Sequence, residues 1–250
     1  MTIRIAMWSG PRNLSTAMMR SFGSRTDTFV TDEPFYGCFL TQTGLDHPMR
    51  EEVIASMDCA WRSVMHTLSG APPDGSPVWY QKHMWHMMVG PIGYDDFAGF
   101  RHAFLIREPE RMIASYLKKR EAARFEDFGL EKQAEFFERE SDRLGRAPPV
   151  IDANDVLADP AAVLSRLCEA LGIAWDPAML GWAPGRRATD GVWAAHWYNA
   201  VEKSTGFGEP DTGPVELSQE DRRLAERMRP YYERLAAFRI EPAGQRARSS

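Results

Sequence analysis

The chain has 250 residues and a formal net charge of −5, from 30 Lys and Arg against 35 Asp and Glu. Hydrophobic residues make up 44% and charged residues 26%, which suits a globular α/β domain with a sizeable core. This composition excludes collagen, coiled coils and wholesale disorder. A mildly acidic chain is also a poor candidate for general nucleic-acid binding, which usually needs a basic surface.

The cysteines and the apolar stretches indicate the cellular compartment of the protein. Cys38, Cys59 and Cys168 are odd in number and form no CxxC pair, so we expect free thiols in a reducing compartment and no disulfide framework. No signal peptide and no run of 18 apolar residues is seen, which predicts a cytoplasmic protein without a membrane span. We expect one domain over residues 1–243 and a disordered C-terminal tail over 244–250.

Short apolar runs alternate with helical patterns along the chain. Strands are expected at 3–8, 29–31, 78–81, 103–106 and 150–151. Apolar residues recur at helical spacing over 14–22, 112–117 and 156–171, and Gly172 is expected to close the last stripe. This alternation predicts an α/β fold with a central parallel sheet, whose ligands bind outside the carboxyl ends of the strands.

The loop after the first expected strand is suited to an oxyanion. A helix start offers free backbone N–H groups, to which this loop adds one cation and two hydroxyls. The sequence GxxxxGK[ST] is absent, and a tight turn with Asn13 or Ser15 as N-cap is the alternative. The candidate anion-binding residues are Gly10, Pro11, Arg12, Asn13, Leu14, Ser15 and Thr16.

The fourth strand exit carries an arginine and a serine eight residues apart. Arg107 ends the expected strand, Pro109 suits the first turn of a helix, and Ser115 lies two turns further on. The pair reaches one phosphate only if the helix folds back across the sheet edge. Otherwise Ser115 is a spacer in that helix.

Candidate bases follow the second and third strands. Asp32 and Glu33 come directly after residues 29–31, and the alternatives to a base are a Walker-B-like magnesium site or a plain acidic turn. His83 follows the third strand, and histidine has the ordinary pKa best suited to a base at neutral pH. The spacing of His83 and His86 gives little support to a zinc site.

Taken together, these motifs resemble the sulfotransferase family, which uses 3′-phosphoadenosine 5′-phosphosulfate (PAPS). The resemblance runs from about residue 3 to about residue 191, includes a helix over 155–172, and implies a three-layer fold like that of P-loop NTPases. It assigns the 5′-phosphosulfate to residues 10–16, where Arg12 stands in place of a lysine and Asn13 and Leu14 replace Ser-Gly. It assigns the 3′-phosphate to Arg107 and Ser115.

The resemblance also proposes a third cofactor segment and two possible bases. Arg186 and Arg187 lie in the third segment and are candidate phosphate ligands or a surface basic pair. Glu33 with Pro34 is similar to the Glu-Pro of bacterial and heparan-type members, and His83 is similar to the catalytic histidine of cytosolic members. We favour Glu33 as the base, because Pro34 restricts its backbone, and we assign His83 to orienting the acceptor.

The function that this resemblance implies is transfer of a sulfuryl group from PAPS to a hydroxyl or amine of a small acceptor, with Arg12 stabilising the leaving phosphate. No metal is required, and the sequence does not indicate an oligomeric state. The alternatives are a P-loop kinase using ATP and magnesium, and a non-catalytic nucleotide-binding module. Aromatic residues indicate either an apolar or aromatic acceptor pocket or ordinary core packing: Trp79, Trp85, Trp193, Trp197 and Tyr198.

Overall fold

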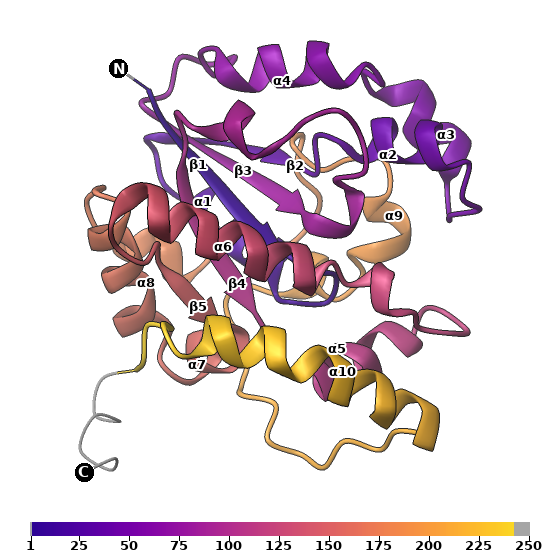
Figure 1. Ribbon diagram of the computed structural model, residues 1–250. Coiled ribbons are helices and arrows are strands. Elements are labelled where there is room, and N and C mark those ends of the chain that lie inside the picture. The colour runs from indigo at the N-terminus through magenta and orange to yellow at the C-terminus, as the bar shows by residue number, and fades with distance from the viewer. Residues whose placement is uncertain (1, 243–250) are drawn as a thin grey trace.

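A parallel β-sheet forms the centre of the protein in the computed structural model, which describes residues 2–242 (Figure 1). Its five strands run in the order β2-β3-β1-β4-β5, and every neighbouring pair is parallel. The expected strands and the expected α/β fold are confirmed, and each strand is one to three residues longer than its apolar run. The strands are β1 (Ile3–Ser9), β2 (Thr28–Asp32), β3 (Val78–Met84), β4 (Arg101–Ile106) and β5 (Val150–Asp152).

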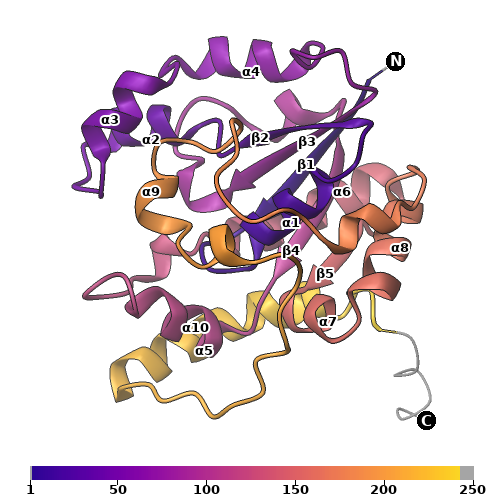
Figure 2. The same ribbon diagram turned by 180° about the vertical axis from the view of Figure 1, so that it is seen from behind.

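Helices cover both faces of the sheet. Figure 1 shows α6 and α10 in front of the strands, and the view from behind in Figure 2 shows α1 and α8 on the opposite face. Within the described residues the α-helices are α1 (Ser15–Phe22), α2 (Tyr36–Thr43), α3 (Arg50–Ser56), α4 (Trp61–Ser69), α5 (Pro109–Leu117), α6 (Leu130–Leu144), α7 (Ala153–Ala158), α8 (Pro160–Ala170), α9 (Ala194–Trp197) and α10 (Gln219–Ala236). Short 3₁₀ helices occupy Trp85–Met87, Tyr94–Phe97, Phe125–Asp127, Pro177–Leu180 and Val201–Lys203.

The sheet separates two hydrophobic clusters. Successive side chains of a strand point to opposite faces, so Met7 of β1 joins the cluster that contains Phe22 of α1. Its neighbour Trp8 joins the cluster that contains Phe104 of β4 and Phe136 of α6. Both faces of β1 are therefore buried, which explains its nearly continuous apolar sequence.

The expected stripe over 156–171 is divided between two helices. Asp159 ends α7 and caps α8 by accepting a hydrogen bond from the Ala162 N–H at 3.0 Å. Pro160 at the first position of α8 reinforces this restart because its fixed φ suits a helix start. Gly172 follows α8 with φ 64°, the left-handed conformation expected of a closing glycine.

The carboxyl ends of the strands meet at one edge. In the register of the sheet Ser9 is paired with Met84 on one side and with Leu105 on the other, and Asp32 is paired with Lys82. The segments that leave β1, β2, β3 and β4 therefore start side by side. No helix within residues 2–242 is long and apolar enough to cross a membrane. The expected tail over 244–250 lies outside the described residues.

Candidate functional site

The loop between β1 and α1 is held in an unusual backbone path. Arg12 and Leu14 have φ values of 62° and 68°, in the left-handed region that costs energy for residues other than glycine. A Cβ on Gly10 would lie 2.7 Å from the Phe128 carbonyl oxygen, so only glycine fits there. The N-cap of α1 is Leu14, and neither Asn13 nor Ser15 takes that place. Because leucine offers no capping oxygen, the N–H groups of the first turn are left for a ligand.

Side chains of this loop attach it to both neighbouring strands. Asn13 is fully buried, and its Nδ2 donates to the Leu105 carbonyl of β4 at 3.2 Å. Ser15 is buried at the start of α1. Thr16 accepts a hydrogen bond at Oγ1 from the Nζ of Lys82 on β3, at 3.2 Å. Asn13 thus fixes the loop to β4, and Thr16 fixes it to β3.

The two arginine motifs, which are almost a hundred residues apart in the chain, contact each other directly. The Arg12 Nε donates to the Ser115 Oγ at 3.1 Å, and Arg107 donates from its terminal nitrogen to the Arg12 carbonyl at 2.9 Å. Burial lowers the pKa of the Arg12 guanidinium, and the positive charge of Arg107 lowers it further. Two partly buried cations this close together favour an anion between them.

Two residues that the sequence analysis did not single out complete this cluster. The carboxylate of Asp211, in the segment before α10, is 3.2 Å from a terminal nitrogen of Arg107 and 2.9 Å from one of Arg111. Arg111 also contacts Glu108 at 3.0 Å. Arg107, Arg111 and Ser115 follow one another at intervals of four residues, a spacing that places side chains on one face of a helix and could have indicated Arg111. No local sequence pattern indicated Asp211.

At the next strand exit, Glu33 and Lys82 form a buried network. Lys82 Nζ lies 2.8 Å from Glu33 Oε1 and 2.9 Å from Asp32 Oδ1, and it donates to the Tyr198 hydroxyl at 2.6 Å. Tyr198 in turn donates to the second oxygen of Asp32 at 2.7 Å. The Lys82 and Asp32 side chains are 1% exposed and that of Glu33 is 10% exposed. Of these three side chains, only Glu33 is therefore within reach of a molecule at the edge of the sheet.

The charges in this network decide how Glu33 titrates. Burial raises the pKa of Glu33, and the neighbouring Asp32 carboxylate adds to the rise, against the opposing effect of Lys82. Burial alone would lower the pKa of Lys82, but the Asp32 and Glu33 carboxylates raise it well above its usual value. Lys82 therefore stays charged, and Glu33 becomes a stronger base than an exposed glutamate. Glu33 also has φ 41°, a strained backbone at the very exit of β2.

His83 lies on the other face of β3. Its side chain stacks on Trp8 with ring centroids 4.6 Å apart, contacts Phe35 and Phe97 at 5.9 and 5.4 Å, and pairs through Nε2 with Gln81 at 3.2 Å. Neighbouring side chains of a strand alternate, so placing Lys82 beside Glu33 directs His83 into the aromatic core. The structure does not bring His83 together with Glu33 and Arg12.

This burial predicts how His83 affects acid stability. Burial lowers the pKa of His83 to about 3, against about 6.5 in an unfolded chain, so the unfolded state binds the extra proton between these pH values. The free energy of unfolding should then fall as the pH falls from about 6.5. In a His83→Phe variant that loss should be smaller by about 1.4 kcal/mol per pH unit below about pH 6. Urea titrations at several pH values measure it, and identical pH slopes for both proteins would contradict the placement.

The two arginines of the third segment expected to bind cofactor have their hydrogen-bond partners within that segment. Arg186 is exposed, and Arg187 donates from its side chain to the Ala183 carbonyl. Within residues 2–242 no hydrogen bond or ion pair joins either arginine to those at the β1 and β4 exits. The segment is instead fixed by Asp190, whose carboxylate accepts two hydrogen bonds from the buried Arg20 of α1, at 2.5 and 2.7 Å.

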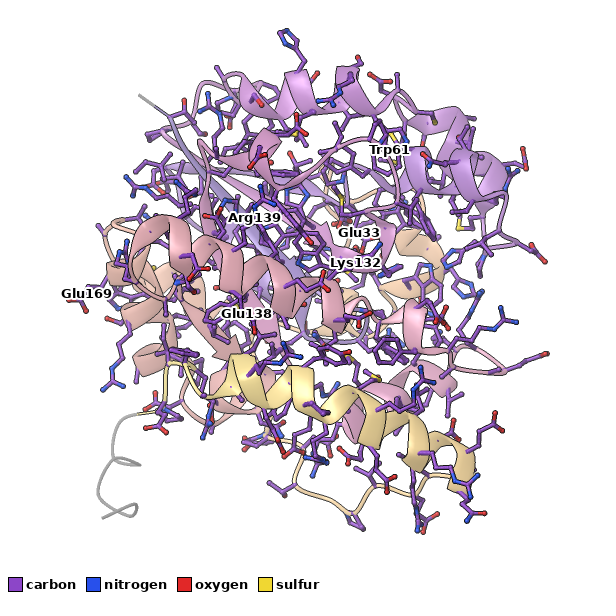
Figure 3. All side chains as sticks on the ribbon, viewed as in Figure 1. Glu33, Trp61, Lys132, Glu138, Arg139 and Glu169 are labelled. Carbon is purple, nitrogen blue, oxygen red and sulfur yellow. The ribbon has the colours of Figure 1, made fainter. Side chains whose placement is uncertain are left out.

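Aromatic side chains surround the edge of the sheet beside Glu33. Tyr36 packs edge-on against Trp193 with centroids 5.1 Å apart, and its hydroxyl is hydrogen-bonded to His47. His47 lies against Trp197 at 5.7 Å. Figure 3 labels Glu33 near the carboxyl ends of the strands, well away from Glu169 at the end of α8. Of the tryptophans considered in the sequence, Trp193 and Trp197 lie here, whereas Trp79 and Trp85 belong to the cluster on the α6 side.

Across residues 2–242 no group of three or more His, Cys, Asp or Glu side chains is arranged to hold a metal ion. Cys38, Cys59 and Cys168 are free thiols. The groups that converge at the carboxyl ends are three arginines with a serine and Asp211, two carboxylates with their lysine, and aromatic rings.

Comparison with known proteins identifies a family over nearly the whole chain. The family model described as "Sulfotransferase domain" matches residues 3–239. Two Arabidopsis thaliana proteins match over 231 residues, or 91% of this chain: branched-chain-amino-acid aminotransferase-like protein 1, 36% identical, and protein 2, 34% identical. The chain spans only 40% of the length of these two relatives.

Solved structures share the fold at low sequence identity. The sulfotransferase domain from the curacin biosynthetic pathway has a TM-score of 0.56 and 19% identity, with 92% of this chain and 98% of that one covered. A sulfotransferase from Alicyclobacillus acidocaldarius has a TM-score of 0.54 and 16% identity, with 95% of each chain covered. At such identities the similarity establishes the fold alone.

Proposed function

This chain belongs to the sulfotransferase family, and from that premise we propose that it moves a sulfuryl group from PAPS to a hydroxyl, or less readily an amine, of a small acceptor. The observation that carries the proposal is the direct contact between the two arginine motifs, Arg12 with Ser115 and Arg107 with the Arg12 carbonyl. A donor with phosphate groups at both ends of its ribose needs two cationic subsites at a short separation. Such subsites occur here at adjacent strand exits.

The residues present fit PAPS. When bound, PAPS supplies an activated sulfuryl group on its 5′-phosphate. The N–H groups at the start of α1, with Arg12, Ser15 and Thr16, would hold the 5′ end, because a helix N-terminus and hydroxyls favour oxyanions. Arg107 and Ser115 would hold the 3′-phosphate. Arg107 also has a buried Nε without a partner among residues 2–242, a donor still available to this subsite if the side chain shifts.

The chemistry assigned to the chain is proton removal and charge stabilisation. Glu33 would take the proton from the acceptor hydroxyl, since its raised pKa makes it a better base than an exposed glutamate. Arg12 would stabilise the negative charge that develops on the leaving phosphate, as in loose phosphoryl transfer. Lys82 connects the two sites, because its Nζ contacts both Glu33 and Thr16.

The acceptor would enter from the aromatic side of the edge. Tyr36, whose backbone N–H donates to the Glu33 carbonyl, is buried against Trp193, while Trp197 of the same aromatic group is partly exposed. A small acceptor with an apolar or aromatic body suits this side. The kinase alternative gains no support, because both oxygens of Asp32 are engaged by Lys82 and Tyr198.

The cofactor assignment predicts selectivity for a 3′-phosphate. The product nucleotide 3′-phosphoadenosine 5′-phosphate (PAP) should bind the wild-type protein more tightly than AMP by roughly ten- to a hundredfold, because charge-assisted hydrogen bonds contribute about 1.5–3 kcal/mol. Arg107→Ala should remove most of that preference while leaving AMP affinity nearly unchanged. Isothermal titration calorimetry of both nucleotides with both proteins measures it.

The control is ATP with and without magnesium. Equal affinity of the wild-type protein for PAP and AMP would overturn the assignment of Arg107 and Ser115. Magnesium-dependent ATP binding much tighter than PAP binding would favour a phosphotransferase instead.

A further inference from the structure

One carboxylate bridges two arginines where the 3′-phosphate is proposed to bind. Asp211 Oδ2 is 3.2 Å from Arg107, and Asp211 Oδ1 is 2.9 Å from Arg111. Each oxygen of one small anion thus rests on a different guanidinium. This is the arrangement in which a phosphate with several oxygens binds a pair of arginines.

Arg111 is placed by its helix to act with the residues already assigned to this subsite. It lies on α5 four residues before Ser115, so both side chains are on the same face of the helix, one turn apart. The Arg107 and Arg111 side chains are only 16% and 12% exposed, whereas that of Asp211 is 49% exposed. The cations are therefore fixed in the protein, and the anion lies on their outer side.

The segment that carries Asp211 has no regular structure over residues 208–214. It is joined to α5 by the Asp211 contacts and by a hydrogen bond from Arg111 to the Gly213 carbonyl at 3.1 Å. Beyond the arginines, no ion pair or side-chain hydrogen bond of Asp211 occurs within residues 2–242. Its carboxylate is the only anion in the described chain that bridges Arg107 and Arg111.

The charges of the cluster set Asp211 against an incoming phosphate. Arg12, Arg107 and Arg111 carry three positive charges, and Asp211, Glu108 and the Asp152 carboxylate near Arg107 carry three negative charges. A phosphate monoester brings roughly two negative charges at pH 7. If Asp211 stayed in place, the cluster would become net negative, and two anions would compete for the same donors.

We propose that Arg111 is a third side chain of the 3′-phosphate subsite and that Asp211 is an internal carboxylate occupying that subsite until the nucleotide displaces it. The inference rests on the proposed function, because it takes the 3′-phosphate as the ligand. Arg111 then contributes to selecting 3′-phosphorylated nucleotides over AMP. Asp211 weakens every 3′-phosphorylated ligand by the cost of breaking its two ion pairs.

The test is calorimetric titration of PAP and AMP into the wild-type protein, Asp211→Asn and Arg111→Ala. Asparagine keeps the size of Asp211 and removes its charge, so Asp211→Asn should bind PAP roughly fivefold more tightly, the upper range for an exposed ion pair. Arg111→Ala should bind PAP roughly tenfold more weakly. Both variants should bind AMP as the wild-type protein does, since AMP has no 3′-phosphate.

The matched control is Glu209→Gln, which removes one negative charge from the same segment. Glu209 is exposed and forms no ion pair within residues 2–242, so its loss should leave PAP affinity unchanged. If Asp211→Asn and Glu209→Gln improve PAP binding equally, or if neither does, Asp211 does not occupy the subsite. If Arg111→Ala weakens PAP and AMP alike, Arg111 is not part of it. A wild-type protein that does not prefer PAP to AMP would overturn the proposed cofactor itself, and this inference with it.

Discussion

Replacing Glu33 with glutamine is expected to lower sulfuryl transfer by roughly a thousandfold and to leave PAP affinity unchanged, because a general base typically contributes 10²–10⁴. Glutamine keeps the shape of the side chain and its contact with Lys82, which lies 2.8 Å from the Glu33 carboxylate. It cannot take a proton from the acceptor. The arginine cluster at Arg12 and Arg107 is not altered, so the nucleotide should still bind.

The pH dependence of kcat/KM separates this loss from a general disturbance of the site. Burial raises the pKa of Glu33, and a base acts only when deprotonated. In the wild-type protein kcat/KM should therefore fall as the pH drops through that raised pKa, and the residual rate of Glu33→Gln should lack this acid limb. Titration of PAP into the variant provides the binding control.

His83→Phe is the matched comparison, because it changes the other base considered from the sequence. Its ring would remain in the stack with Trp8 and Phe97, away from Glu33. We expect this variant to keep most of its turnover. If His83→Phe abolishes transfer while Glu33→Gln retains it, with PAP bound by both, the base is His83 and the assignment of Glu33 is wrong.

The architecture was predictable because the signals for it are local. Apolar runs between helical patterns defined all five strands, and the rule that parallel strands place ligands at their carboxyl ends selected Arg12, Glu33 and Arg107 in advance. The break between α7 and α8 depends on Asp159 and Pro160, which a continuous apolar stripe obscured. The sequence predicts such a break only if the N-cap signal of Asp159 and Pro160 is given more weight than the continuous helical spacing of the apolar residues.

The face on which each strand residue lies could not be predicted. Lys82 and His83 are adjacent on β3, so their side chains must point to opposite faces of the sheet. The sequence does not indicate which of the two lies on the face of Glu33. A strand buried on both faces gives no polar side from which to choose. Tyr198 and Asp211 come from segments distant in sequence, and only the folded chain brings them to Asp32 and Arg107.

Lys82→Met is expected to destabilise the protein by about 3–5 kcal/mol, since removing one partner of a buried ion pair leaves an uncompensated charge. Lys82 and Asp32 are each 1% exposed, and methionine fills a similar volume without the charge. Two carboxylates, Asp32 and Glu33, would then remain together without a cation. Urea unfolding measured at neutral pH gives the loss in the free energy of unfolding.

The double variant Lys82→Met with Asp32→Asn tests whether charge, and not packing, causes that loss. Removing both members of the pair leaves no buried unpaired carboxylate at position 32, so much of the stability should return even though two contacts are gone. Glu33 would keep its place but lose both Lys82, which lowers its pKa, and the Asp32 carboxylate, which raises it. Because the effect of Lys82 is the larger of the two, the acid limb of any remaining activity should move to higher pH. A double variant as unstable as Lys82→Met alone would show that Lys82 stabilises the protein through its packing. It would contradict the inference that the Lys82 charge stabilises the Asp32 and Glu33 carboxylates.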